Sequence, residues 1–131
     1  MRRNHVPNHS QLQAAIDATG FPLVLDTFYQ PFESSGFHPC KLGDADSGFE
    51  VLWQPIEEIY DAWPTLRDAI QDRDVCLTFI WHGDMAECAS VLIVSAALAR
   101  GFDAVVFNQD HEILSTADQL MDEANAAIEG I

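Results

Sequence analysis

Four side chains in the second half of the chain have the atom types of a divalent-metal site. His82, Asp84 and Glu87 lie close together in the sequence, and His111 stands in a later turn. Imidazole nitrogens and carboxylate oxygens are common metal ligands, and open sheets tend to bind ligands where a strand ends. These four residues are therefore the candidates for a metal-dependent or small-molecule-processing enzyme.

The same residues also have a structural explanation. Asp84 precedes the apolar run 85–100, so its carboxylate can cap the first turn of a helix, and Glu87 three residues later can complete a capping box. The spacing also differs from His-Glu-x-x-His and from closed zinc sets. We therefore predict no metal and no cofactor. Only His82 is left without a structural role.

Other catalytic signatures are missing from the sequence. The turn at 43–48 begins with an Asp-x-Asp pattern but lacks the length and the distal Glu of a calcium-binding loop, so it is interpreted as a hairpin turn. No Gly-x-Ser-x-Gly motif is present, and Cys88 follows an acidic residue on an apolar helix, where its thiolate is disfavoured. We predict no catalytic residue.

An acidic and aromatic stretch, residues 43–66, has the composition of a protein-binding surface. Trp53, Tyr60 and Trp63 lie among its carboxylates, and it contains no basic residue. Opposite charge steers an encounter between proteins, and buried aromatic anchors hold the complex. Inward packing is the alternative for each Trp, because large aromatic side chains mostly pack into the core. The predicted partner-binding residues are Asp44, Asp46, Glu50, Glu57, Glu58, Asp61 and Trp63.

The net charge indicates what kind of partner such a surface would bind. Six Lys and Arg stand against 21 Asp and Glu, which gives −15 at neutral pH. This field repels nucleic acids and anionic membranes and attracts basic proteins, although solubility alone is an alternative explanation.

Three further features of the sequence indicate where the protein acts. The three cysteines form no Cys-x-x-Cys pair, the run 91–99 is too short to cross a bilayer, and Met1 is not followed by a secretory signal pattern. We expect a cytoplasmic protein that binds neither nucleic acid nor membrane.

Hydrophobic periodicity places these residues on an α+β framework. Residues 1–131 are expected to form one domain, with a mixed, mostly antiparallel sheet of about five or six strands and the buried helix 85–100 packed on it. The expected elements are a flexible arm (1–7), a helix (from 8 or 10 to 18), a strand (21–26), a hairpin (40–42 and 49–54), short helices (56–63 and 65–71), a strand (75–81), the helix 85–100, strands (104–107 and 112–114) and a last helix (from 115 or 116 to 128).

Two connections in this framework are predicted in more detail. Gly101 stands where a left-handed residue often ends a helix. Because a strand, a helix and a strand follow one another over 75–107, we expect a right-handed parallel crossover.

Three segments, 47–53, 79–87 and 97–109, carry a resemblance to known proteins. Their sequences, Ser-Gly-Phe-Glu-Val-Leu-Trp, Phe-Ile-Trp-His-Gly-Asp-Met-Ala-Glu and Ala-Leu-Ala-Arg-Gly-Phe-Asp-Ala-Val-Val-Phe-Asn-Gln, resemble small bacterial immunity proteins of polymorphic and type VI secretion toxin systems. The resemblance implies a small acidic α+β protein that binds one cognate toxin and covers its active or substrate-binding site. The alternatives are an enzyme that uses His82, Asp84 and Glu87, and a regulatory adaptor without catalytic activity.

Overall fold

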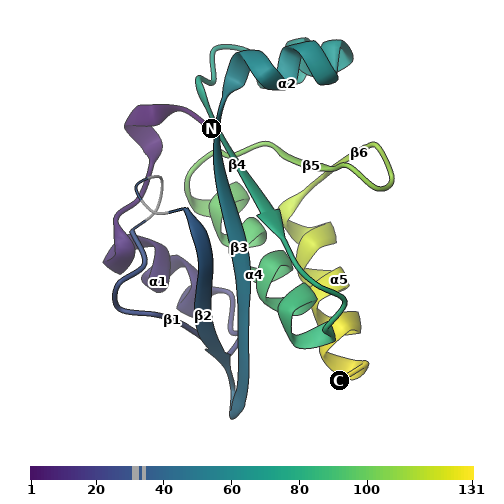
Figure 1. Cartoon of the computed structure of the whole chain (residues 1–131). Helices are drawn as coiled ribbons and strands as arrows, with labels where there is room; N and C mark the ends of the chain where they lie inside the picture. Colours follow the sequence, from purple (N-terminus) through teal and green to yellow (C-terminus); the bar gives the residue numbers. More distant parts are fainter. Residues whose placement is uncertain (31–32, 34) are drawn as a thin grey trace.

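A four-stranded antiparallel sheet, a smaller two-stranded sheet and a set of helices make up the fold (Figure 1). The structure is a computed structural model that describes residues 1–30, 33 and 35–131. The elements are η1 (Arg3–His5), α1 (His9–Ala18), β1 (Leu23–Leu25), β2 (Gly36–Leu42), β3 (Ala45–Pro55), α2 (Ile56–Ala62), η2 (Pro64–Leu66), α3 (Arg67–Ile70), β4 (Val75–Ile80), α4 (Met85–Gly101), β5 (Val106–Asn108), β6 (Ile113–Ser115) and α5 (Ala117–Glu129). The predicted α+β class is confirmed.

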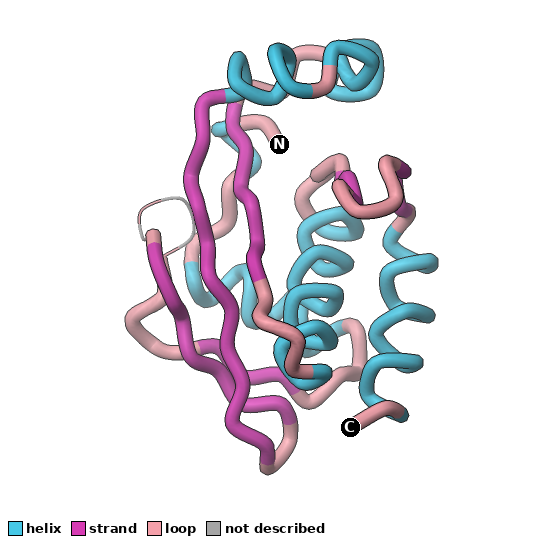
Figure 2. The backbone as a smooth tube through the Cα atoms, turned by 45° about the vertical axis from the view of Figure 1, so that its right-hand side comes forward, coloured by secondary structure: helices cyan, strands magenta, loops and turns pink. Residues whose placement is uncertain are grey.

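Helix α4 is the centre of the core, as the sequence predicts. It lies between the four-stranded sheet and α5 (Figure 2). Its apolar residues point in all directions around the axis, and Ile93 and Val94 are fully buried. On the inner face of the sheet, Phe49 is also fully buried, with its ring edge-on to those of Tyr29 at 6.1 Å and Phe79 at 5.4 Å. A helix that is apolar on every side is stable only when it is covered on every side.

Helix α4 begins at the predicted cap but ends differently from the prediction. The Asp84 carboxylate caps the helix as expected, accepting the Ala86 and Glu87 N–H groups at 2.7 and 3.2 Å. Gly101 still belongs to the helix, and the left-handed residue is Asp103, with φ 55°. The chain therefore turns two residues later than the glycine predicts.

The predicted parallel crossover is wrong. β4 is an edge strand of the four-stranded sheet, whose order is β1-β2-β3-β4, while β5 pairs with β6 in a separate sheet, and every pairing is antiparallel. The left-handed turn at Asp103 explains the difference, because the buried Arg73 donates a hydrogen bond from Nε to the Asp103 carbonyl at 3.0 Å. This contact holds the chain beside α3 instead of returning it to the edge of β4.

The predicted hairpin is confirmed with a tighter turn. β2 and β3 pair from Leu42↔Ala45 onward, so the loop consists of Gly43 and Asp44. Gly43 has φ 61°, a conformation that side chains disfavour and that two-residue hairpin turns require. Residues 45–48, expected in the turn, are part of β3.

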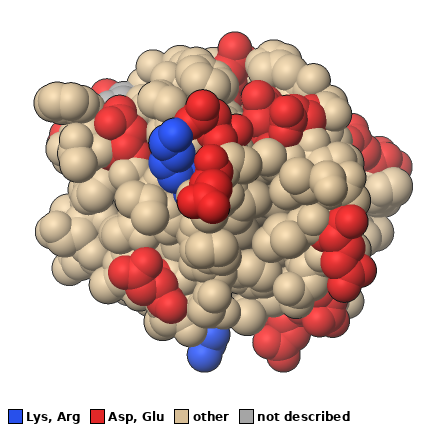
Figure 3. Space-filling view, turned by 90° about the horizontal axis from the view of Figure 1, so that it is seen from below, with Lys and Arg blue, Asp and Glu red and all other residues tan. Residues whose placement is uncertain are grey.

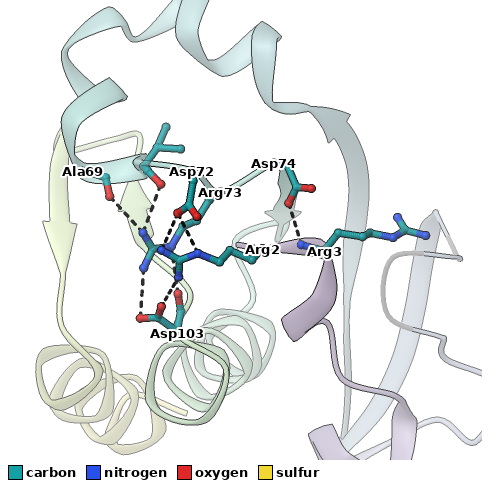
Figure 4. A network of polar contacts seen from close by, with 8 residues as sticks. Arg2, Arg3, Ala69, Asp72, Arg73, Asp74 and Asp103 are labelled. Atoms are coloured by element: carbon teal, nitrogen blue, oxygen red, sulfur yellow. Dashed lines mark hydrogen bonds and ion pairs between the residues drawn. The ribbon is translucent and has the colours of Figure 1, made fainter.

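The expected flexible arm at residues 1–7 is also wrong. Met1 is buried, its ammonium donates to the Val75 carbonyl at 3.0 Å, and its own carbonyl accepts the Val75 N–H at 3.1 Å. The Arg2 guanidinium pairs with Asp72 and Asp103, and the Arg3 N–H donates to the Asp74 carboxylate at 2.7 Å (Figure 4). The polar composition of residues 1–7 does not indicate that Met1 pairs through its backbone with Val75, 74 residues away.

Arg73 is the centre of this polar network (Figure 4). Besides its bond to the Asp103 carbonyl, the guanidinium donates to the carbonyls of Ala69 and Ile70 at 3.4 and 3.2 Å and forms an ion pair with the Asp103 carboxylate at 3.1 Å. Its side chain therefore joins the end of α3 to the loop after α4. Together with Arg2, it connects the first residues of the chain to both.

The carboxylates of this network predict how stability responds to acid. Hydrogen bonding to Arg2, followed by the charge of Arg73, lowers the pKa of Asp103, and hydrogen bonding to Arg2 lowers that of Asp72. A carboxyl whose pKa is lower in the folded state stabilises the protein above its unfolded pKa of about 4 and loses that contribution as the pH falls through the folded value.

We expect Asp103→Asn to lower the melting temperature by a few degrees at about pH 6, and the difference from wild type to shrink steadily as the pH falls below about 4. Thermal unfolding followed by circular dichroism at several pH values measures this difference. Asn also tolerates the left-handed conformation at this position, so the backbone is preserved. Asp122→Asn on the exposed face of α5 is the control. A difference that persists unchanged into acid would contradict the ion-pair explanation.

Candidate protein-binding surfaces and the groove beside strand β4

The predicted acidic surface is divided between two ends of the molecule. Asp44 and Asp46 lie at the tip of the β2–β3 hairpin, whereas Glu57, Glu58 and Asp61 lie on α2 at the other end of β3 (Figure 1). An 11-residue strand is about 35 Å long at the usual rise per residue. The predicted residues therefore form two separate acidic groups, with Glu50 on the strand between them.

The acidic groups differ in how far they are already neutralised. Asp46 forms an ion pair with Lys41 on the neighbouring strand, and Asp44 is exposed in the turn. The Glu50 carboxylate lies 3.5 Å from Nε2 of His82. On α2, Glu57 and Asp61 are exposed, and the Glu58 carboxylate accepts a hydrogen bond from Gln54 at 3.3 Å. The α2 group is therefore the more open to a basic partner.

Trp63 is positioned by the protein's own packing. Its ring lies edge-on to that of Phe107 at 5.1 Å, and it covers a small apolar cluster of Ile56, Leu66 and Ile70. This agrees with the structural alternative for Trp63. Trp53 is 40% exposed on β3, so it is the more accessible of the two residues.

The four candidate metal ligands are not brought together. Glu87 accepts the His82 N–H at 3.1 Å, Asp84 caps α4, and His111 lies in the exposed turn between β5 and β6. Glu87 thus bonds to His82 rather than closing the predicted capping box with Asp84. Over residues 1–30, 33 and 35–131, no group of three His, Cys, Asp or Glu side chains is placed to hold a metal ion. His82, Asp84, Glu87 and His111 therefore do not form a shared metal site in the described residues.

A large groove beside β4 is the feature that the sequence did not predict. It has a volume of about 850 Å³ and lies between β4, α4, α5, the β5–β6 hairpin and the short helices after β3. Leu77 and Phe79 of β4 line one side, and Val91 and Leu92 of α4 line another. Its one sequence signal is β4 itself, whose residues Val75–Ile80 include no charge and no proline.

The groove also contains two cysteines that behave as apolar lining. Burial raises the pKa of the Cys76 thiol, and the Glu58 carboxylate adds to the effect. Burial likewise raises the pKa of the Cys88 thiol, with a further contribution from Glu123. Both thiols are therefore protonated at neutral pH, which removes the nucleophile that cysteine chemistry needs. Glu123 of α5 also lines the groove.

Most of the basic side chains are already engaged within the protein. Arg2, Lys41 and Arg73 form ion pairs, and the Arg67 guanidinium lies 4.6 Å from the centre of the Tyr60 ring. Carboxylates are spread over the face seen in Figure 3, where basic groups are few. The surface field is therefore negative over much of the molecule.

Neither models of protein families, nor curated proteins, nor solved structures match this chain. Within the described residues, no helix is long and apolar enough to cross a bilayer.

Proposed function

We propose that this protein is a non-enzymatic binding protein whose partner is a basic protein. The observation that carries the proposal is the uncompensated negative charge. Of six Lys and Arg against 21 Asp and Glu, three already form ion pairs within the protein, whereas Glu57 and Asp61 on α2 are exposed. Such a field accelerates association with a cationic partner and opposes binding to nucleic acid.

Within this class, we propose an immunity protein that acts in the cytoplasm by covering the active or substrate-binding site of a cognate antibacterial toxin. The resemblance of segments 47–53, 79–87 and 97–109 supports this choice. A toxin that acts on an anionic substrate such as nucleic acid presents a basic site, which complements an acidic inhibitor. A regulatory adaptor would share the acidic surface but would not protect a cell from a toxin.

Co-expression with the protein encoded next to this one tests the proposal. We expect a complex that co-elutes in size-exclusion chromatography, weakens as salt is raised, and restores growth of cells that produce the neighbour. Charge reversal on α2 (Glu57→Lys, Glu58→Lys and Asp61→Lys together) should weaken binding about tenfold or more. The matched variant at the other acidic group is Asp44→Lys with Asp46→Lys.

Three outcomes separate the possibilities. A complex with growth rescue supports the immunity function, and the two charge-reversal variants show which acidic group contributes. A complex without rescue supports the adaptor. If the neighbour is toxic and gives neither complex nor rescue, the proposed function is wrong.

A further inference from the structure

The outer edge of β4 presents backbone groups that are not paired. Val75 exchanges hydrogen bonds with Met1 at 3.0 and 3.1 Å, so its N–H and C=O point away from β3. In an antiparallel strand this direction alternates from residue to residue, so the backbone N–H and C=O groups of Leu77 and Phe79 also point away from β3. Among the described residues, neither of these two forms a backbone hydrogen bond outside the β3–β4 pairing.

The opposite edge of the sheet is protected. On β1, the Gln13 side chain of α1 donates to the Leu23 carbonyl at 2.9 Å and accepts the Leu25 N–H at 2.8 Å. Proteins usually protect sheet edges in this way or with charges, prolines or bulges, because an open edge can pair with another chain. Within the part of the chain that the structure describes, only Met1 pairs with the outer edge of β4, and the strand contains no charge and no proline.

The side chains around this edge suit an added strand. Leu77 and Phe79 face the inner side of the sheet, where the groove continues to Val91 and Leu92 of α4. Cys76, Thr78 and Ile80 border the groove along the edge of the strand, but by the alternation of a strand their side chains point to the other side of the sheet, which also carries Glu50 opposite Ile80 in the register. An incoming strand would therefore meet an apolar wall on one face and carboxylates on the other.

We propose that an extended basic segment of the partner protein adds to β4 as a fifth antiparallel strand, with apolar residues opposite Leu77 and Phe79 and basic residues between them. This proposal rests on the proposed function and names the part of the surface that binds. Glu50 lies opposite Ile80, and Glu58 accepts a hydrogen bond at 3.3 Å from Gln54, which is opposite Cys76, so both carboxylates are on the side of the basic residues. Asp110 and Glu123 line the groove. A second copy of this chain fits less well, because pairing the same edge would bring two chains of charge −15 together.

The pairing fixes which backbone groups of the added strand matter. The residues of the added strand that lie directly opposite Leu77 and Phe79 would donate their backbone N–H groups to β4. Their side chains would point to the same apolar face as those of Leu77 and Phe79. A suitable probe is therefore the capped, fluorescently labelled peptide (Val-Lys)₄. Methylating the backbone nitrogens of the valines removes the N–H donors that face β4. Methylating the backbone nitrogens of the lysines removes only N–H donors that face away from β4.

We expect the unmodified and lysine-methylated peptides to bind equally in a fluorescence anisotropy titration, and the valine-methylated peptide to bind at least about tenfold more weakly. The peptide (Ser-Lys)₄, with the same charge and no apolar face, should also bind weakly. In the protein, Glu58→Gln should weaken binding, while Asp44→Asn at the hairpin tip should leave it unchanged. Equal binding of all four peptides would show simple charge attraction and overturn the proposal, as would no binding at all.

Amide hydrogen exchange locates the bound peptide on the sheet. In the free protein the Leu77 and Phe79 amides should exchange quickly, while the Thr78 amide, which faces β3, is protected. Adding (Val-Lys)₄ should slow exchange at Leu77 and Phe79. If the partner forms its complex while these two amides remain unprotected, the edge proposal fails and the proposed function stands. If the peptide protects them but no partner binds, the proposed function fails and the edge site stands.

Discussion

Replacing Arg73 by methionine is expected to lower the free energy of unfolding by about 3 kcal/mol. Methionine keeps the apolar volume of the side chain but removes every donor to the carbonyls of Ala69, Ile70 and Asp103. The side chain is only 7% exposed, so water cannot readily replace those bonds. Denaturant unfolding followed by circular dichroism measures the loss.

Two further variants define the cause of this effect. Arg73→Lys keeps the charge but replaces a planar group of five donors with one ammonium, so we expect a loss between wild type and Arg73→Met. Arg3→Met is the matched control, because the Arg3 side chain points away from the network and its contact with Asp74 uses the backbone N–H (Figure 4). A loss as large for Arg3→Met as for Arg73→Met would show that the guanidinium contacts are not the source of stability.

Phe49→Ala is expected to lower the free energy of unfolding by about 4 kcal/mol. The ring is fully buried and touches the rings of Tyr29 and Phe79, so its removal leaves a cavity between β3, β4 and the loop after β1. The same unfolding experiment measures the effect. Phe28→Ala, at a side chain that is 83% exposed, should change stability by less than about 0.5 kcal/mol. Similar losses in the free energy of unfolding for both variants would mean that burial of the Phe49 ring is not a main source of stability.

The parts of the fold that local chemistry determines could be predicted from the sequence. Asp84 caps α4, the β2–β3 hairpin forms around Gly43, and the apolar run after Asp84 becomes the central helix. Each depends on residues that are close in sequence and have a strong local preference, such as a capping carboxylate or a glycine with positive φ.

What could not be predicted depends on contacts between distant residues. The pairing of Met1 with Val75 and the bonds of Arg73 to Asp103 decide where the first residues lie and where β5 goes, and no periodicity reveals either contact. The candidate site was affected in the same way. Asp44 and Glu57 belong to one acidic stretch of sequence, but the straight course of β3 carries them to opposite ends of the sheet.

The open edge of β4 gives the net charge a second consequence, for the protein while it is unbound. Two such edges can pair with each other, and mutual repulsion between chains of charge −15 opposes that pairing. This protection depends on solution conditions. Concentrated salt shortens the reach of the repulsion to about 3 Å at 1 M, and near the isoelectric point of 4.3 the charge itself disappears. The free protein is therefore expected to resist self-association best in dilute salt and at neutral pH.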